Sequence, residues 1–452
     1  MKDESKIYLF EEMPIFKAVA TLAIPTVIGS LVMVLYNLAD TYFVGMINDP
    51  IETAAVTLAA PVLLAFNAVN NLFGVGCSSL MSRCLGLKDY KMVKQTSVFG
   101  IYGCIFSAGL FSLACTLFSG PLLDLLGAKE NTIMATQQYM FWTVTCGAIP
   151  SILNVVLSNM VRSEGSAFHA SIGTMAGCIL NMILDPIFIL PFGLNMKAAG
   201  AGCATFISNC IACLYFFIVI YRNRKTTYVC VNPSMFTFNP KIIKEVCKVG
   251  VPAMVQNLLN VTGMTILNNF TAVYGAEAVS AMGITHKINM IPMYITMGTG
   301  QGIMPLIGYN YAAKNAKRMK DAILFTAKFS IGFILVVTVI YFFKSEFIIS
   351  LFMKDALIIE HGAKLLRGFC LGLVFLSVDF LAVGIFQAVG MGKESFIFAI
   401  MRKILLEIPA MYILNKIYPL YGLSYSQLVA EFVLAIAAIF VLKKLFKSVE
   451  EQ

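Results

Sequence analysis

Long runs of apolar residues, almost free of charge, recur along the whole chain. Twelve runs reach about 20 residues or more, the length at which an α-helix crosses the hydrocarbon core of a bilayer. The runs are continuous and do not alternate with polar residues, which favours helices over the strands of a membrane barrel. Hydrophobic residues make up 59% of the 452 residues and charged residues 13%, whereas soluble proteins average about 25% charged. The sequence therefore predicts an all-α integral membrane protein with twelve transmembrane helices. The expected spans are residues 16–44, 54–80, 95–119, 133–160, 168–190, 199–221, 243–273, 278–307, 322–343, 365–390, 395–416 and 424–442.

The positions of the basic residues predict how these helices are oriented. If the N-terminus is cytoplasmic, most of the 33 Lys and Arg residues fall on the cytoplasmic side, as the positive-inside rule requires. Arg83, Arg162, Arg222, Arg402 and Lys403 are among them. The net charge of +9 is then a topology signal and does not indicate a nucleic-acid partner. We expect a multi-pass protein of the plasma (inner) membrane with both termini in the cytoplasm.

Two halves of the chain repeat each other. Residues 222–242 are basic and then rich in Asn and Pro, and six predicted helices lie on either side of them. We expect an N-terminal lobe at residues 1–221, a cytoplasmic linker at 222–242 and a C-terminal lobe at 243–452. "GVGCSSLMSRCLGLKDYKMVK" matches "GTGQGIMPLIGYNYAAKNAKRMK" at an offset of 226, which pairs Gly76 with Gly302. Six helices per lobe give two pseudo-symmetric lobes of the same orientation, as in many secondary transporters that bind substrate at the repeat interface.

Acidic residues inside the predicted spans are the strongest functional signal. A charge at the centre of a membrane helix costs roughly 2.5–3.5 kcal/mol on insertion scales, so such residues normally face a bundle interior or a watery cavity. We expect Asp379 to line a central cavity and attract a cationic substrate, and Glu407 to pair with Lys403 one helical turn earlier. The five acidic residues within spans are Asp40, Asp185, Asp379, Glu407 and Glu431.

The segment "CILNMILDPIFIL", residues 178–190, combines an amide, a carboxylate and a proline. Asn181 and Asp185 are four residues apart and therefore share one helix face. Pro186 removes a backbone donor, so the helix is expected to bend or open beside Asp185. Asp40 and Thr205 lie at a similar depth in the first and sixth spans, and all four side chains can meet within one lobe. Their oxygens suit Na⁺ and a buried carboxylate suits H⁺; the alternative is a polar cluster that only joins helices.

Sequence motifs of nucleotide hydrolysis and covalent catalysis are absent. The pattern GxxxxGK[ST] does not occur, so we expect no ATP hydrolysis, and no HExxH, GxSxG or kinase set is found. We expect no enzymatic activity and no cofactor beyond a coupling ion, H⁺ or Na⁺. The nearest alternative function is a lipid-linked precursor flippase, which favours a cationic groove for pyrophosphate, whereas the buried charges here are mainly acidic. A membrane glycosyl or acyl transferase is a further alternative, but the loops are short.

Six segments carry a resemblance to a known family. They are "IPTVIGSLVMVLYNLADTYFVG", "SRCLGLKDYKMVKQ", "MVRSEG", "NMILDPIFI", "GAGCATFIS" and "PLIGYNYAAKNAKRMK". Through them the chain resembles the multidrug and toxic compound extrusion (MATE) family over almost its whole length, and the last segment looks most like the bacterial MepA-like branch. The resemblance implies two six-helix bundles around a central cavity. It also implies export of organic cations or amphipathic drugs, in exchange for H⁺ or Na⁺, by alternating access.

The resemblance also implies roles for particular residues. DinF-like members place their coupling site on an Asp of the first helix, an Asn and an Asp four apart on the fifth, and a Thr on the sixth. These positions correspond to Asp40, Asn181, Asp185 and Thr205. Bending near Pro25 is then expected to reshape the cavity. Other branches carry an acid on the seventh helix, where this chain has amides instead, so a cation site in the second lobe is in doubt. The candidate cavity residues are Tyr36, Asn37, Gln256, Asn257, Met293 and Asp379.

Overall fold

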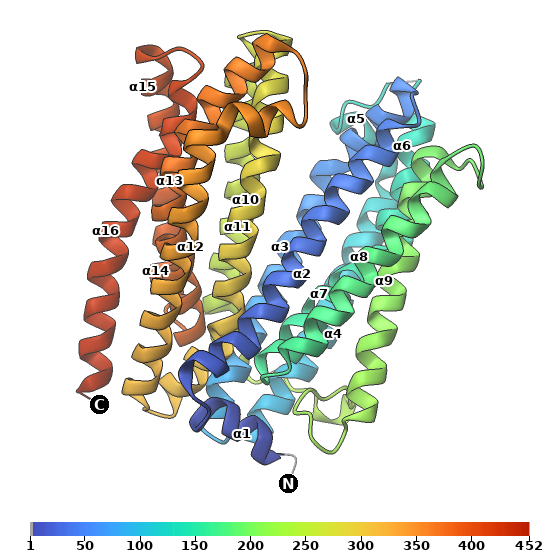
Figure 1. Cartoon of the computed structure of the whole chain (residues 1–452). Coiled ribbons are helices and arrows are strands. Elements are labelled where there is room, and N and C mark those ends of the chain that lie inside the picture. Colours follow the sequence, from blue (N-terminus) through green and yellow to red (C-terminus); the bar gives the residue numbers. More distant parts are fainter. Residues whose placement is uncertain (1–2, 130, 452) are drawn as a thin grey trace. The chain divides into compact units, whose positions relative to one another are not determined.

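The computed structural model describes residues 3–129 and 131–451, and every regular element within them is a helix. The helices are coloured along the sequence in Figure 1. Contacts divide the chain into two compact units. Unit 1 contains the described residues up to Ile7 together with Ile28–Met254, and unit 2 contains Tyr8–Val27 and the described chain from Val255 onward.

The predicted spans are all helical. The first half of the chain contains α1 (Asp3–Glu11), α2 (Ile15–Gly45), α3 (Pro50–Gly86), α4 (Tyr90–Leu117), α5 (Ser119–Leu125), α6 (Ile133–Met140), the π-helical η1 (Phe141–Cys146), α7 (Ala148–Ser163), α8 (Ala167–Ile189) and α9 (Lys197–Arg222). The second half contains the short η2 (Pro233–Met235), α10 (Pro240–Ala272), α11 (Ala276–Ala312), α12 (Ala316–Ser350), α13 (Ala356–Val389), α14 (Gly392–Ile400), the π-helical η3 (Met401–Glu407), α15 (Ile408–Ile417) and α16 (Gly422–Glu450).

Seven of the described helices are long and apolar enough to cross a membrane. The number rises to eight if α6–η1 and α7, which are bent by 47° at Gly147, are counted as one span. The remaining predicted spans correspond to α10, α11, α16 and the three short consecutive elements α14, η3 and α15, all of which are helical. The chain is thus a multi-pass membrane protein.

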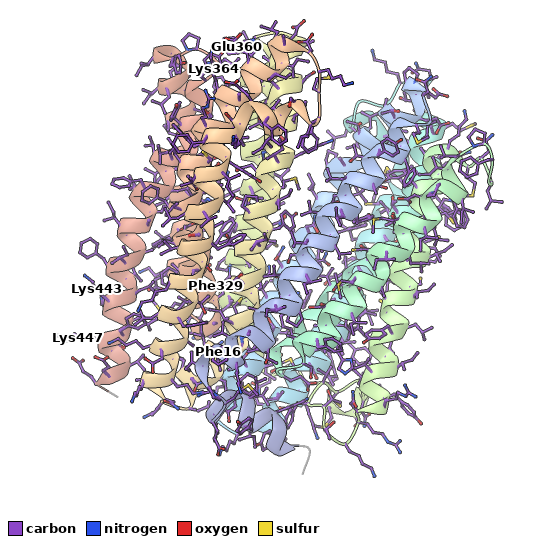
Figure 2. The ribbon with its side chains drawn as sticks, in the orientation of Figure 1. Phe16, Phe329, Glu360, Lys364, Lys443 and Lys447 are labelled. Atoms are coloured by element: carbon purple, nitrogen blue, oxygen red, sulfur yellow. The ribbon has the colours of Figure 1, made fainter. Side chains whose placement is uncertain are left out.

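Unit 2 is built around α13. The most apolar window of this helix is 72% buried inside the protein, and α11, α12 and α16 pack against it. In contrast, α12 exposes large apolar side chains such as Phe329, which is 61% exposed and is labelled in Figure 2. Lys443 and Lys447 lie near the end of α16 in the same view. An apolar outer face with cations toward the helix end is typical of a helix that faces lipid.

In unit 1, α3, α4 and α7 pack together, and α8 lies against α9, as Figure 1 also shows. Gly173 of α8 allows this last contact, because a Cβ at that position would overlap the ring of the fully buried Phe216 on α9. The close approach of α8 and α9 brings the two helices that carry Asn181, Asp185 and Thr205 side by side.

The division into units falls inside two helices, in each case just after a proline. It separates Val27 from Ile28 in α2, after Pro25, and Met254 from Val255 in α10, after Pro252. These two prolines are equivalent in the sequence repeat, because "LAIPTVIGSLVMVLYN" in the first half matches "VGVPAMVQNLLNVTGM" in the second. The grouping therefore differs from the predicted lobes 1–221 and 243–452: residues 222–242 and the start of α10 group with unit 1, and residues 8–27 group with unit 2.

The segment between α9 and α10 is fixed to unit 1 by a buried carboxylate. Glu164, only 3% exposed, accepts hydrogen bonds from Thr227 Oγ1 at 3.0 Å and from the Tyr228 backbone N–H at 2.7 Å. Lys6 Nζ lies 2.8 Å from the same carboxylate, and Tyr102 donates to the Val231 carbonyl at 3.0 Å. The predicted linker is therefore an ordered strap on unit 1.

Candidate ion and substrate sites

The predicted coupling residues on α8 lie in the interior of unit 1. Asp185 is 0% and Asn181 2% exposed, and the two side chains are one helical turn apart on the same face. Pro186 lies inside α8, which continues as a helix to Ile189. The structure thus places a carboxylate and an amide where water has little access.

Asn181 connects Asp185 to Thr205 of the neighbouring helix. With its amide nitrogen toward Asp185, Asn181 donates to both carboxylate oxygens, at 2.8 and 3.2 Å, and its oxygen accepts from Thr205 Oγ1 at 3.1 Å. In the reverse orientation the nitrogen donates to Thr205 Oγ1 at 3.1 Å, and the amide oxygen faces the carboxyl group. The first arrangement matches an ionised Asp185, and the second matches a carboxyl group that carries a proton and can donate it.

Asp40 and two tyrosines complete this group. Asp40 of α2 interacts electrostatically with Asp185, and Tyr36 and Tyr139 interact with both carboxylates. Asp40 is partly exposed. Within the described residues, neither acid forms an ion pair with a lysine or arginine. The structure therefore brings together the four predicted coupling residues, and their negative charge has no basic side chain to balance it.

Tyr139 was not predicted, and Tyr36 was predicted only as a cavity residue. Tyr139 comes from α6, more than 40 residues before Asp185, and is 7% exposed. A tyrosine in an apolar span carries no distinctive pattern, so the sequence offers no signal for its position beside the acids. Its hydroxyl adds a polar group at a site otherwise formed by α2, α8 and α9.

Unit 2 contains a second buried charge cluster, which includes an arginine. Arg402 on η3 lies between Asp379 of α13 and Glu431 of α16, with Nη1 to Oδ2 at 3.7 Å and Nη2 to Oε1 at 2.7 Å. All three side chains are at most 6% exposed. Arg402 was counted among the basic residues of the cytoplasmic side, and the structure shows that it is paired inside the bundle of unit 2. Counting cations along the sequence does not detect such a pairing.

The neighbouring pair on η3 agrees with prediction. Lys403 Nζ lies 2.7 Å from Glu407, one turn later. Lys403 is 13% exposed and lies close to Gly263 of α10, so it too packs inside unit 2. A π-helical segment carries both basic residues and Glu407, and such segments are frequent at functional sites.

The candidate cavity residues are divided between the units. Tyr36 and Asn37 belong to unit 1, and Asn37 is exposed and bonds locally to the Met33 carbonyl at 3.0 Å. In unit 2, Gln256 accepts from Gln387 at 3.3 Å. Asn257 has a buried side-chain oxygen without a hydrogen bond. Met293 packs against a core cluster that contains Ile334 and Leu376. Asp379 faces Arg402 rather than an open space. The assignment of these residues to a substrate cavity stays a prediction.

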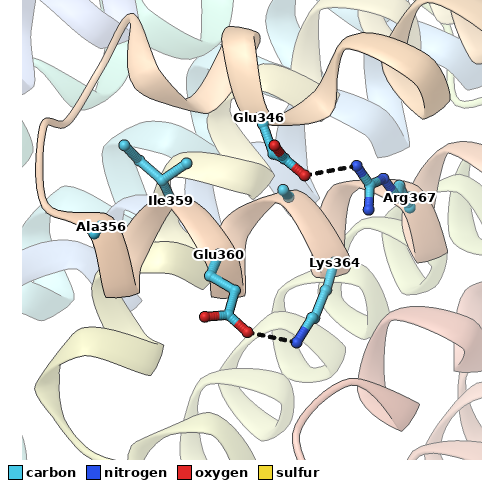
Figure 3. Close-up of a pocket in the computed structure, with 7 residues that line it drawn as sticks. Glu346, Ala356, Ile359, Glu360, Lys364 and Arg367 are labelled. Carbon is cyan, nitrogen blue, oxygen red and sulfur yellow. Dashed lines mark hydrogen bonds and ion pairs between the residues drawn. The ribbon is translucent and has the colours of Figure 1, made fainter.

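A surface depression of about 270 Å³ lies between α12 and α13 of unit 2 (Figure 3). Its charged groups pair with one another: Glu346 with Arg367 at 3.0 Å, and Glu360 with Lys364 at 2.7 Å. Because its charges are already paired, this depression offers no free group for a substrate. Among the described residues, no cluster of three or more His, Cys, Asp or Glu side chains is arranged to hold a metal.

Comparisons with known proteins give a consistent result over the whole chain. The MatE family model matches residues 25–187 and 252–413, once in each half. The multidrug export protein MepA of Staphylococcus aureus (strain N315) is 37% identical over 444 residues, which cover 98% of this chain and 96% of that protein. A crystal structure of MATE in complex with MaL6 has a TM-score of 0.92 at 25% identity, and an outward-facing multidrug resistance MATE family transporter of the MOP superfamily has 0.90 at 25%. Each match covers 99% of this chain and 99% of the other. The buried acids and the repeated helices are therefore those of a membrane transporter, and the chain belongs to the multidrug and toxic compound extrusion (MATE) family.

Proposed function

We propose that this chain is a multidrug efflux antiporter. It lies in the plasma membrane with both termini in the cytoplasm. It exports organic cations and amphipathic drugs by alternating access. Uptake of H⁺ or Na⁺ at Asp40, Asn181, Asp185 and Thr205 drives the export. The observation that carries the proposal is the fully buried Asp185, with Asp40 beside it and no basic partner for either acid among the residues that the structure describes. The names of the curated relatives, which are multidrug export proteins, support the substrate class.

The buried acids explain why an ion must bind. An ionised carboxylate without a partner costs several kcal/mol in a protein interior. A proton or Na⁺ removes this cost, so an occluded pocket is stable only when the ion is bound. Release of the ion on the opposite side then destabilises the closed pocket and resets the transporter.

The Asn181 amide suits both candidate ions. When Asp185 takes up a proton, the amide turns so that its oxygen accepts from the carboxyl group and its nitrogen donates to Thr205. For Na⁺, the same turn presents the amide oxygen beside the carboxylate oxygens and Thr205 Oγ1, which are the hard ligands that such a cation prefers. Pro25 is the point at which α2 can respond, since it leaves an interior backbone carbonyl without its donor.

The gradients supply enough free energy for this exchange. A proton yields about 1.4 kcal/mol per pH unit, and a net charge that crosses the membrane yields about 2.3 kcal/mol per 100 mV. One H⁺ exchanged for one monovalent organic cation moves no net charge. The membrane voltage then contributes only if a second proton moves, and Asp40 provides a second carboxylate for it.

The test is ethidium efflux from intact cells that contain the wild type, Asp185→Asn or Asp124→Asn. Asp124 is an exposed acid outside the long helices, so its variant is the matched control. We expect efflux by the wild type and the control to stop when the pH gradient is collapsed, or to continue only with a Na⁺ gradient, and Asp185→Asn to be inactive under both. Full-rate efflux by Asp185→Asn contradicts the coupling site. If the folded wild type transports no organic cation, the efflux function is contradicted and the flippase alternative is favoured.

A further inference from the structure

The charge cluster of unit 2 differs from the acids of unit 1 in one respect: a cation is already present. The Arg402 guanidinium occupies the space between Asp379 and Glu431, and its Cζ lies 4.7 Å from the centre of the Phe380 ring. A cation between two carboxylates and over an aromatic face has the surroundings in which proteins bind a cationic ligand. In unit 1, by contrast, Asp40 and Asp185 have no basic side chain between them among the described residues.

Arg402 interacts with the two carboxylates mainly through opposite charge, and forms few hydrogen bonds. Its Nε and Nη1 atoms are buried and form no hydrogen bond, and the same is true of Asp379 Oδ1 and Glu431 Oε2. A guanidinium can donate five hydrogen bonds and normally pairs with carboxylates through two at once. The cluster thus keeps unused carboxylate oxygens beside the arginine, nine-tenths buried or more.

The other charged groups near the cluster balance each other. Lys403 and Glu407 form their own ion pair on η3. His286 of α11 lies near that pair. What remains is Arg402 with two carboxylates, a net charge of −1 if both are ionised. Removal of the guanidinium would leave two acids with no cation between them, as in unit 1, where Asp185 is fully buried and Asp40 partly exposed.

We propose that Arg402 is a resident cation of unit 2. Its guanidinium takes the place that a metal cation would otherwise occupy between Asp379 and Glu431, and it thereby excludes Na⁺ from this half of the transporter. Metal-dependent coupling is then confined to unit 1. This consequence for transport rests on the proposed antiport function, whereas the exclusion of Na⁺ is a binding property that stands without it.

The test measures Na⁺ binding through thermal stability, which requires no transport. The purified protein carries Asp40→Asn and Asp185→Asn, so that unit 1 cannot respond, and its Tm is compared in NaCl and in choline chloride at equal ionic strength. With Arg402 present we expect no difference between the salts. With Arg402→Gln added, we expect Na⁺ to raise Tm by about 3 °C or more, as a ligand that binds only the folded state does. Arg402→Lys, which keeps the charge, is the matched control and should not respond.

Each other outcome also decides the question. A further change, Asp379→Asn, should abolish the Na⁺ response of the Arg402→Gln protein. If Arg402→Gln folds only in NaCl, the proposal is supported; if it folds in neither salt, or folds without responding to Na⁺, the proposal is wrong. A Na⁺ response with Arg402 intact that disappears with Asp379→Asn also overturns it. Loss of ethidium efflux in the wild type would contradict the proposed function and leave these Tm results unaffected.

Discussion

Asn181 donates from its side-chain nitrogen to both carboxylate oxygens of Asp185, at 2.8 and 3.2 Å, from one turn earlier on α8. The same amide reaches Thr205 on α9, so a change at Asp185 reaches the neighbouring helix through one side chain. A carboxylate that exchanges its ion needs a partner that can serve both as donor and as acceptor. An amide does so by turning, which neither a carboxylate nor a lysine can do.

Asn181→Ala should therefore weaken the binding of the coupling ion without abolishing transport. Loss of a hydrogen bond to a buried charged group costs about 1.5–3 kcal/mol, which corresponds to a rise of roughly 10- to 150-fold in the half-maximal ion concentration. The measurement is ethidium efflux as a function of the pH or Na⁺ gradient. Asn71→Ala is the matched control, because the Asn71 amide bonds only to the Asn67 carbonyl of its own helix. An unchanged ion dependence in Asn181→Ala would show that Asp185 acts without this amide.

The positions of the helices could be predicted because each one corresponds to a long run of apolar residues in the sequence. A membrane helix must be apolar along its whole length, so α2, α4 and α8 are visible as runs, and the i, i+4 spacing of Asn181 and Asp185 fixes their shared face. The convergence of α2, α8 and α9 followed from the resemblance and from depth along the helices.

Pairing between distant helices could not be predicted in the same way. Arg402 lies 23 residues from Asp379 and 29 from Glu431, and nothing in a linear pattern states which acid a basic residue will meet. The count of basic residues along the chain does not indicate that η3 buries Arg402 and pairs it with an acid. The division of α2 and α10 between the two units also could not be predicted. Pro25 and Pro252 suggest a bend, but the sequence does not show which part of each helix packs with which unit.

Gly76 and Gly302, which are equivalent in the sequence repeat, should be equally intolerant of a side chain. A Cβ on Gly76 would lie 2.6 Å from the Val246 carbonyl oxygen, and one on Gly302 would lie 2.7 Å from Ala23 Cα. Because backbone atoms cannot turn away, Gly76→Ala and Gly302→Ala should each destabilise the protein by about 1–3 kcal/mol, measured as a fall in Tm. Gly109→Ala and Gly332→Ala are the matched controls, since nothing lies within 4 Å of a Cβ there. Equal Tm values for all four would contradict these close backbone contacts.

Asp49 should contribute a pH-dependent part of the stability at the start of α3. The backbone N–H of Ile51 and the ammonium group of Lys197 hold the pKa of Asp49 below its usual value of 3.8. A lowered folded-state pKa means that the contribution is complete above the unfolded-state pKa and is lost as the pH falls through the folded-state pKa. Asp49→Asn, which keeps a capping oxygen but no charge, should lower Tm at neutral pH and converge with the wild type toward about pH 3. A constant difference in Tm across this range would exclude a contribution from the charge.

Glu164→Gln should loosen the strap between α9 and α10. Glu164 is nearly inaccessible and holds Thr227, Tyr228 and Lys6, so its neutral replacement leaves donors unsatisfied at a cost of about 1–3 kcal/mol. Local opening then becomes more frequent, and trypsin should cleave at the exposed Arg224 about tenfold faster or more. Glu245→Gln is the control, because Glu245 of α10 pairs with Arg83 of α3 at 2.8 Å. Equal cleavage rates in the two variants would show that other contacts hold this segment.

Pro25→Ala should leave the protein folded but reduce the bending of α2. The substitution restores a backbone donor inside the helix and removes the clash of the proline ring with the preceding turn, a burden of about 3 kcal/mol in a soluble helix. The protein should therefore fold with an equal or higher Tm, while ethidium efflux falls because the helix that carries Asp40 no longer bends easily. Pro61→Ala is the matched control: Pro61 lies inside α3, away from the point at which either helix is divided between the units. Pro252→Ala tests the equivalent position of α10 and should behave like Pro25→Ala if both helices bend during transport. Full efflux in Pro25→Ala would show that transport does not depend on bending at this residue.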